Sequence, residues 1–383
     1  MFNNCSLYFE KTEVDILNQY EEFVKEYISP FTKKMEDTEQ IDKDYWYRLG
    51  EHRYLGPIID KKYGGLGGSV ALFAEMTRIL SKQSGSFGLA YDIHAGLASY
   101  MISKYGSEKQ KEAILPEMAS GKKVVSFAMS EEQAGSDISG IKTEAYNDGN
   151  LYHIYGKKIF TSNAINADLF LTVAKVKGTE NSMTLFIIEN DPKTVKIVER
   201  MNMIGLKALF VGTEEFKDVV LKNGSIIGNI GDGTKIALSA LDIARIGVAA
   251  QAVGIGEAAF EYAYKYAKER RQFNNTISEI RTISDYFAEM YTNLHTARIT
   301  YLDAAKKIET NEKTISASVA KIYCTEKCKK VVDTAMQIVG GRSYLLNNSL
   351  QRYMRDIKIT EIYEGTNEIQ KYIIFNQLKK LLG

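Results

Sequence analysis

The stretch Thr234–Arg271, TKIALSALDIARIGVAAQAVGIGEAAFEYAYKYAKERR, follows Gly231-Asp232-Gly233 and predicts one uninterrupted helix. At 1.5 Å per residue such a helix is roughly 57 Å long. Gly254-Ile255-Gly256 lies inside this helical pattern and not after a strand, so a dinucleotide-binding turn lacks its strand–turn–helix context. We interpret these glycines as small residues that allow close helix packing.

Helical patterns continue on the carboxyl side of this stretch. A second long segment covers Ser278–Glu309, and a third covers Ser316–Val339 and stops at Gly340-Gly341. A last helix follows Asn367, where Asn367 and Gln370 have the spacing of a capping box and Ile369 begins an apolar face. Residues 231–383 are therefore predicted to form a helical bundle domain.

The amino side of the stretch changes character twice. Residues 14–123 repeat apolar side chains at three- and four-residue spacing, which predicts helices. Short runs rich in β-branched and apolar residues then predict strands. These runs are 124–129, 151–155, 169–176, 184–188 and 195–198. We therefore predict an α+β fold with an N-terminal helical domain (1–123), a middle β domain (124–230) and a C-terminal helical domain (231–383).

The composition excludes several classes of protein. Lys and Arg total 49 against 48 acidic residues, so the basic excess of a nucleic-acid-binding protein is missing. No run of eighteen apolar residues predicts a membrane span, and the first ten residues do not resemble a secretory signal. Three cysteines fit a reducing cytoplasm. Cys324 and Cys328 have the spacing of two metal ligands, but no partner pair is evident, so we predict buried thiols and no metal site.

Six separated motifs carry a stronger indication of function. They are SEEQAGSD (130–137), KIFTSN (158–163), LDIARIG (241–247), ERRQF (269–273), QIVGG (337–341) and IYEGTNEIQ (362–370). In order and spacing they resemble the acyl-CoA dehydrogenase family over about residues 107–382. The resemblance implies that family's fold, with a C-terminal four-helix bundle, and an FAD-dependent oxidoreductase of CH–CH bonds. Its reaction removes an α-proton and a β-hydride from an acyl thioester.

Glu364 is the predicted catalytic base, because the resemblance places the base here and a desolvated carboxylate has a pKa raised toward that of its substrate. Some relatives carry the base beside the arginine of the Leu-Asp-x-x-Arg motif, but the matching residue here is Ala244, which cannot accept a proton. Related nitroalkane oxidases are expected to have aspartate in place of Glu364. Both observations favour the dehydrogenase arrangement.

The resemblance also implies which residues hold FAD. Phe127, Met129, Ser130, Phe160 and Ser162 are expected against the isoalloxazine ring, although Phe160 is alternatively a core side chain. Arg270, with Gln272 and Phe273, and Gln337, Gly340 and Gly341 are expected to meet the FAD of an adjacent subunit, where a guanidinium suits the pyrophosphate. The alternative for Arg270 is a surface ion pair. Thr366 and Glu368 fall at a helix start that favours negative charge.

Substrate contacts are predicted on three segments. Asp242 and Arg245 resemble a pair near the thioester entrance, and Ser136 resembles a contact to the pantetheine arm; each is alternatively a structural polar residue. Tyr363 and Gly365 flank the base, and the Glu364 amide is expected to bind the thioester carbonyl. Because the sequence departs from the family pattern at several positions, the substrates of the family's members do not predict the substrate of this chain. The departures are Glu132 in place of proline, Asn274 and Ser343 in place of glycine, and the altered stretch 205–211.

The sequence thus predicts a cytoplasmic, FAD-dependent acyl-CoA dehydrogenase of short or medium chains in fatty acid metabolism. An electron-transfer flavoprotein is the expected electron acceptor, with an oxidase as the other possibility. A homodimer or homotetramer is expected. One alternative is a dehydrogenase of an acyl or aminoacyl group bound to a carrier protein in natural-product biosynthesis. Another, of a different class, is a non-catalytic partner subunit of the same fold.

Overall fold

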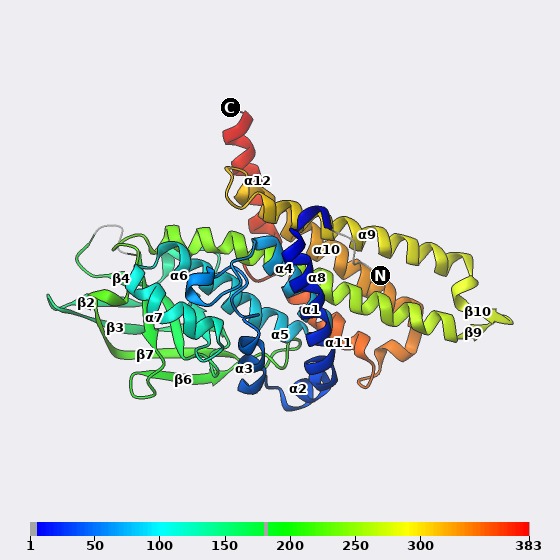
Figure 1. Ribbon diagram of the computed structural model, residues 1–383, viewed down its shortest axis with the longest axis horizontal. Helices are drawn as coiled ribbons and strands as arrows, with labels where there is room; N and C mark the ends of the chain where they lie inside the picture. Colours follow the sequence, from blue (N-terminus) through cyan, green and yellow to red (C-terminus); the bar gives the residue numbers. More distant parts are fainter. Residues whose placement is uncertain (1–5, 180–182, 383) are drawn as a thin grey trace.

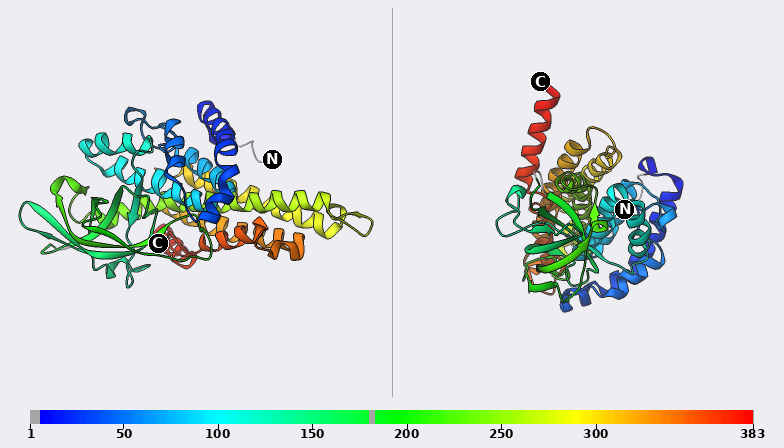
Figure 2. Two further views of the ribbon diagram at one scale, coloured as in Figure 1. Left: turned by 90° about the horizontal axis from the view of Figure 1, so that it is seen from below. Right: turned by 90° about the vertical axis from the view of Figure 1, so that its left-hand side faces the viewer.

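The computed structural model describes residues 6–179 and 183–382. Three regions follow one another along the chain: blue and cyan helices, a green sheet, and long helices coloured from yellow-green to orange. In Figure 1 the sheet lies at the left, the tip of the long helices at the right, and the blue helices between them. The views in Figure 2 place the sheet and the tip of the long helices at opposite ends of an elongated molecule. The α+β fold class predicted from the sequence is therefore confirmed. The division into domains at residues 124 and 231 stays a prediction.

From residue 6 onward, the first region contains seven α-helices. They are α1 (Lys11–Tyr27), α2 (Thr32–Thr38), α3 (Lys43–Glu51), α4 (Val70–Gln83), α5 (Gly85–Tyr91), α6 (Ser99–Tyr105) and α7 (Glu108–Ala119). Between α5 and α6 the chain continues as a π-helix, η4 (Asp92–Ala98), so that 85–105 is one helical rod with a wide turn in its middle. The periodicity of the sequence did not predict this turn, because a π-helix shifts the helical register by a single residue.

A mixed sheet forms the second region. Its strands are β1 (Val125–Ala128), β2 (Glu144–Asn147), β3 (Leu151–Ser162), β4 (Leu169–Val176), β5 (Met183–Glu189), β6 (Val195–Arg200), β7 (Val211–Lys222) and β8 (Ile226–Ile227). The strand order is β6-β7-β3-β2-β4-β5-β8, and β1 pairs in parallel with β4. Aromatic and aliphatic side chains of the sheet region form a separate hydrophobic core, which includes Phe170, Phe186 and Phe216.

Long helices form the third region. They are α8 (Gly233–Glu269), α9 (Arg281–Lys306), α10 (Lys313–Val339), α11 (Ser349–Ile359) and α12 (Asn367–Leu382), with a short hairpin of β9 (Arg271–Gln272) and β10 (Asn275–Thr276) at the tip between α8 and α9. The last helix, α12, projects away from the body of the molecule (Figures 1 and 2).

The helix α8 is the centre of the molecule. It packs against α4, α9 and α10, and most of its residues from Ile236 to Phe260 are buried. Among the described residues it alone is long and apolar enough to cross a membrane, but 89% of its most apolar window is buried inside the protein. A Cβ on Gly254 would lie 2.3 Å from the Arg78 carbonyl oxygen of α4, and one on Gly256 would lie 2.9 Å from Leu294 of α9. These glycines therefore serve close packing, as predicted.

Candidate active site

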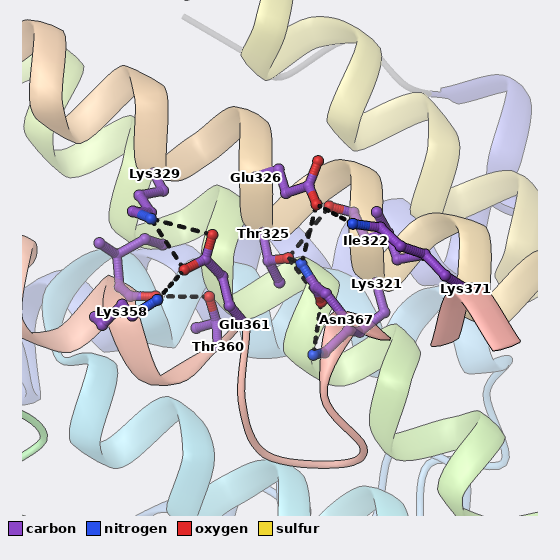
Figure 3. A network of polar contacts seen from close by, with 11 residues as sticks. Lys321, Ile322, Thr325, Glu326, Lys329, Lys358, Thr360, Glu361, Asn367 and Lys371 are labelled. Atoms are coloured by element: carbon purple, nitrogen blue, oxygen red, sulfur yellow. Dashed lines mark hydrogen bonds and ion pairs between the residues drawn. The ribbon is translucent and has the colours of Figure 1, made fainter. Parts of the chain in front are cut away.

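The loop that carries Glu364 is anchored at both ends on α10. At its start, the Glu361 carboxylate pairs with Lys329 of α10 at 3.0 Å and with Lys358 of α11 at 2.6 Å. At its end, Asn367 accepts a hydrogen bond from the Lys321 ammonium at 2.9 Å and donates one to the Thr325 hydroxyl at 3.1 Å. Figure 3 shows that the loop runs between these two anchors, so that both of its ends are fixed.

The tip of the loop is a left-handed turn. Glu364 and Gly365 have φ angles of 53° and 86°, and a Cβ on Gly365 would lie 2.5 Å from the Gln370 amide nitrogen. That nitrogen donates to the Glu364 carbonyl at 3.3 Å and to the Gly365 carbonyl at 2.9 Å. A glutamate in this region of backbone space is strained, and such strain persists where the surroundings hold it and is frequent at functional sites.

The helix start after the loop differs in detail from the prediction. The Thr366 hydroxyl accepts a hydrogen bond from the Ile369 amide at 3.3 Å, so Thr366 caps α12. Asn367, the predicted cap, is the first residue of the helix, and Gln370 reaches back to the turn. The reason is tertiary: buried Lys321 and Thr325 occupy the Asn367 side chain, which leaves the cap to its neighbour.

Glu364 has the electrostatics of a base that works near neutral pH. Burial raises the pKa of its carboxyl to about 7, against the opposing charges of Arg245 on α8 and Lys321 on α10. Burial in turn lowers the pKa of Lys321 to about 8, with Glu364 favouring its charged form. Among the described residues no hydrogen bond fixes the Glu364 carboxylate. The carboxylate is therefore free to accept a proton.

Two of the other predicted substrate residues, Arg245 and Tyr363, lie close to Glu364. Asp242 and Arg245 are both buried on α8 and form an ion pair at 2.7 Å, and the Thr314 hydroxyl donates to Asp242 at 2.8 Å. The Tyr363 hydroxyl donates a hydrogen bond to the side chain of Gln251, one turn further along α8 than the glycine Gly247. The loop is thus held over the segment 245–251 of α8. Ser136 is exposed on the loop between β1 and β2.

The residues predicted beside the isoalloxazine ring lie together at one edge of the sheet. Phe127, Met129, Ser130 and Ser162 are half-buried, and the Ile159 amide donates to the Ser130 carbonyl at 2.9 Å, which joins the end of β1 to β3. Phe160 is 65% exposed with a φ of 57°. The alternative that Phe160 is a core side chain is therefore wrong, because most of the side chain is exposed.

A buried ion pair holds this edge in shape. The Lys158 ammonium contacts the Glu131 carboxylate at 2.8 Å and the Met129 carbonyl at 3.0 Å. Glu131 also accepts the Thr143 amide at 3.0 Å and the Lys142 amide at 2.6 Å. Against the cost of burial, these contacts lower the pKa of Glu131 to about 2, so its charge persists and fixes the segment that begins at Ser130.

The other predicted cofactor residues lie far from this edge in the same chain. Arg270, Gln272 and Phe273 are exposed at the tip beyond α8, and Phe273 is 90% exposed. Along α8 the rise from Arg245 to Arg270 is about 37 Å. Gln337, Gly340 and Gly341 are exposed at the end of α10. The following segment lies beside the far end of α8, where Asn348 donates to the Tyr262 hydroxyl at 2.9 Å. One chain therefore presents two separate sets of these residues.

Two residues of the site had not been singled out in the sequence. Lys321 lies on α10 within charge range of Glu364, and Asp92 lies at the start of η4. The position of Asp92 in the mostly apolar run 89–98 could have indicated a functional residue from the sequence. Cys324 and Cys328 are buried free thiols whose pKa burial raises, as predicted. No cluster of metal-ligating side chains occurs in the described part of the chain. Thr366 is half-buried and Glu368 exposed at the start of α12.

Comparison with known proteins identifies the family. The models of the acyl-CoA dehydrogenase N-terminal, middle and C-terminal domains match residues 10–122, 126–219 and 231–379. A short-chain-specific acyl-CoA dehydrogenase of Clostridium acetobutylicum is 34% identical over 93% of this chain and 95% of its own length. The chain belongs to the acyl-CoA dehydrogenase family, and it is an oxidoreductase of the kind that acts on CH–CH bonds.

Two solved structures extend the comparison. Butyryl-CoA dehydrogenase from Megasphaera elsdenii has a TM-score of 0.93, with 31% identity over 97% of this chain and 99% of its own. The prolyl acyl carrier protein oxidase AnaB has a TM-score of 0.90 with 26% identity over 97% of this chain and 99% of its own.

The edge formed by β1 and β3 fits FAD, the cofactor of this family. Three apolar side chains, Phe127, Met129 and Phe160, are partly or largely accessible there, as a flat aromatic ring requires, and Ser130 and Ser162 supply hydroxyl donors beside them. The individual roles of these residues, and of the exposed residues at the tip, stay predictions.

Proposed function

We propose that the protein removes the α-proton and the β-hydride of an acyl-CoA, with Glu364 as the base. The observation that carries this proposal is the Glu364 carboxyl itself, held on a strained and doubly anchored turn with a pKa raised to about 7 by burial. A base with such a pKa is about half ionised at neutral pH and takes up a proton readily. The short-chain-specific relative supports a short acyl chain.

Residues of this chain would hold the base and the thioester in position. Arg245 and Lys321 supply positive charge that favours the ionised form of Glu364 against the effect of burial. The Glu364 backbone amide, in its left-handed conformation, is proposed to donate a hydrogen bond to the thioester carbonyl. This hydrogen bond strengthens as negative charge develops on the carbonyl oxygen. Tyr363, fixed by Gln251, closes the loop side of the site. FAD, when bound, supplies the acceptor for the hydride.

We further propose that two copies of the chain complete each cofactor site. Phe127, Met129, Ser130, Phe160 and Ser162 would line one side of it, with Thr366 and Glu368 at the helix start. Arg270, Gln272, Phe273, Gln337, Gly340 and Gly341 would approach from a second copy. Their position at the opposite end of α8 supports this arrangement, because they cannot reach the β1–β3 edge of their own chain. A dimer or tetramer in the cytoplasm, passing electrons to an electron-transfer flavoprotein, completes the proposal.

The variant Glu364→Gln tests the base. It keeps the shape of the side chain but cannot accept a proton, so it should bind FAD and acyl-CoA while flavin bleaching slows by several orders of magnitude. Anaerobic stopped-flow absorbance with butyryl-CoA measures this. Glu112→Gln, at an exposed position of α7 outside the predicted FAD and substrate residues, is the control and should bleach within tenfold of the rate of the unchanged protein. Bleaching of the Glu364 variant at the unchanged rate would refute the assignment.

A carrier-bound thioester is the second candidate substrate. AnaB, which shares the fold and 26% of the sequence, is a prolyl acyl carrier protein oxidase. The same reaction on the same base would then act on an acyl or aminoacyl group delivered by a carrier protein. Turnover of one acyl group on CoA and on a carrier protein separates the candidates, and a clear preference for CoA would exclude this one. Product analysis in air, with hydrogen peroxide measured, tells an oxidase from a dehydrogenase.

A further inference from the structure

Asp92 is a buried carboxylate for which the described structure provides no partner. The residue is 1% exposed, and neither of its side-chain oxygens has a hydrogen bond among the described residues. It is the first residue of the π-helix η4, in the middle of the rod formed by α5 and α6. Wide π-turns are rare and occur frequently at functional sites. Buried polar groups almost always have partners, so an unsatisfied carboxylate calls for a specific explanation.

The side chain of Asp92 points at the segment of α8 over which the Glu364 loop is held. A Cβ on Gly247 would lie 2.1 Å from the Asp92 Oδ1 atom, so only glycine leaves room for this carboxylate. Arg245, whose charge acts on Glu364, is two residues before Gly247, and Gln251, which binds Tyr363, is one turn after it. Asp92 and the Glu364 loop therefore meet the same turns of α8.

The other side of η4 faces the predicted flavin wall. Two residues after Asp92, the His94 Nδ1 atom accepts a hydrogen bond from the amide of Val125 in β1 at 3.1 Å. Its Nε2 atom lies 3.2 Å from the Met118 carbonyl, and burial lowers the pKa of the ring to about 4, so His94 is neutral and brings no positive charge to Asp92. Asp92 thus lies on an element that packs against both β1 and α8, and the Glu364 loop is held over the same turns of α8.

We propose that Asp92 binds a protonated nitrogen on the acyl group of the substrate, and that this enzyme acts on an amino-substituted acyl thioester. This inference rests on the proposed reaction at Glu364 and narrows its substrate. A protonated amine would donate to the two free oxygens of Asp92 and would neutralise a charge that burial otherwise disfavours. The shared chemistry is the amine; the thioester carrier is either CoA or a carrier protein.

The charges around Asp92 favour a cation over a neutral donor. Glu364 adds a second carboxylate to the same region, and its charge, after burial, raises the pKa of Asp92 further. Arg245 is already paired with Asp242 at 2.7 Å, and the Lys321 ammonium is bound to Asn367 at 2.9 Å. Glu364 therefore adds negative charge near Asp92, while the two cations near Glu364 are already bound to Asp242 and Asn367. A hydroxyl would satisfy one oxygen of Asp92 and would leave this imbalance unchanged.

Two pairs of substrates with nearly the same shape test the proposal on the FAD-loaded protein. 4-(Dimethylamino)butyryl-CoA is compared with 5-methylhexanoyl-CoA, and prolyl-CoA with cyclopentanecarbonyl-CoA. In each pair a protonated nitrogen is replaced by carbon. The nitrogen lies beyond the reacting α and β carbons in the first pair and is bonded to the α-carbon in the second. Dissociation constants come from the change in flavin absorbance under anaerobic conditions. At least one amine should bind about tenfold tighter than its carbon counterpart, as charged hydrogen bonds allow. A second arm presents the same acyl groups on a carrier protein.

The variant Asp92→Asn assigns the preference to this residue. It keeps the shape of the side chain and removes the charge, so the ratio of the two dissociation constants should fall to about one. Glu214→Gln is the matched control, because Glu214 is also a fully buried carboxylate without a hydrogen-bond partner but lies on β7 of the sheet. Its ratio should equal that of the unchanged protein.

Two results would overturn the inference: equal binding of each amine and its carbon counterpart by the unchanged protein, or an undiminished preference in Asp92→Asn. A different result would overturn the proposed reaction. If amines bind preferentially but no thioester of either kind bleaches the flavin, the binding inference stands and the desaturation proposal fails. If only carbon counterparts bind and bleach, the reaction stands and the role of Asp92 is wrong.

Discussion

Glu364 differs from the other acidic residues of the chain in its backbone conformation as well as its surroundings. Its positive φ is shared by the following glycine, and the amide of Gln370 holds both carbonyls of the turn. The sequence indicated a turn before a helix at this point, and the motif indicated the base. The raised pKa comes from burial, which depends on the helices α8 and α10 packed around the loop.

The first prediction at this scale concerns pH. Because Glu364 must be ionised to accept a proton and its pKa is about 7, flavin reduction should accelerate as pH rises through 7 and level off above it. The initial bleaching rate at saturating substrate, measured from about 1.5 pH units below that pKa to about two units above it, tests this. A rate that stays constant across this range would show that another group is the base.

A second carboxylate, Glu214 on β7, makes the stability depend on pH in a predictable direction. Burial raises its pKa to about 8, so the folded protein holds a proton that the unfolded chain releases near pH 4.5. Stability is therefore lost as pH rises from about 4.5 to 8. Glu214→Gln removes this loss, with a gain on the order of 5 kcal/mol at most, since one pKa unit is about 1.4 kcal/mol. Urea unfolding should show the gain at pH 8.5 and little at pH 5.

At the scale of elements, a buried network of charges joins three helices. Glu75 of α4 pairs with Arg78 at 2.9 Å and with Arg298 of α9 at 2.7 Å, and Arg78 contacts Glu257 of α8 at 2.5 Å. Burial opposes the charge of Glu75, but the two arginines outweigh it and lower its pKa to about 2. The network fixes how α4, α8 and α9 cross, which in turn positions the segment of α8 under the active-site loop.

Removing one member of this network should be costly. Glu75→Ala leaves the buried Arg298 guanidinium without a carboxylate and Arg78 with Glu257 alone, and breaking such a buried pair costs about 3–5 kcal/mol. Urea unfolding measures the loss. Glu261→Gln is the control, because it breaks the partly exposed ion pair of Lys82 and Glu261, at 2.7 Å, between the same α4 and α8. Its cost should stay below about 1 kcal/mol. Equal costs for the two variants would show that the buried network does not stabilise this crossing.

At the scale of the whole molecule, the two sets of predicted cofactor residues lie at opposite ends of the chain. The sheet edge and the tip of α8 are separated along the long axis of the molecule in Figure 2. In the proposed shared site, a second copy that runs in the opposite direction would supply the second set. The exposed side chains Phe273, Tyr344 and Leu346 near the tip, which are 90%, 85% and 89% exposed, are available for such contact.

The prediction at this scale is an oligomer with shared cofactor sites. Light scattering should give a mass of at least two chains of 43.1 kDa. Arg270→Ala should keep that mass but lose FAD on dilution at least tenfold more readily, as measured by flavin released through a desalting column. Arg281→Ala removes another exposed arginine near the tip, which pairs with Asp285, and should retain FAD. A monomer that binds FAD fully would contradict the shared site.

The sequence by itself determined what depends on local pattern. Periodicity predicted the helix at 234–271 and most strands of the middle region, because helices and strands repeat their burial every few residues. It did not predict β2 and β7, whose residues alternate with charges, or the π-turn at Asp92. The motif around Glu364 predicted the base and, through the family, FAD.

Only the tertiary structure decided which distant residues meet. Asp92 and Glu364 are far apart in the sequence, and it is the packing of η4 and the Glu364 loop on the same turns of α8 that brings them together. The same packing removes water from both carboxylates, which raises both pKa values. The exposure of Phe160 and the distance of Arg270 from the sheet edge also depend on how the chain folds as a whole. Burial and proximity are properties of the packed molecule, and no local pattern contains them.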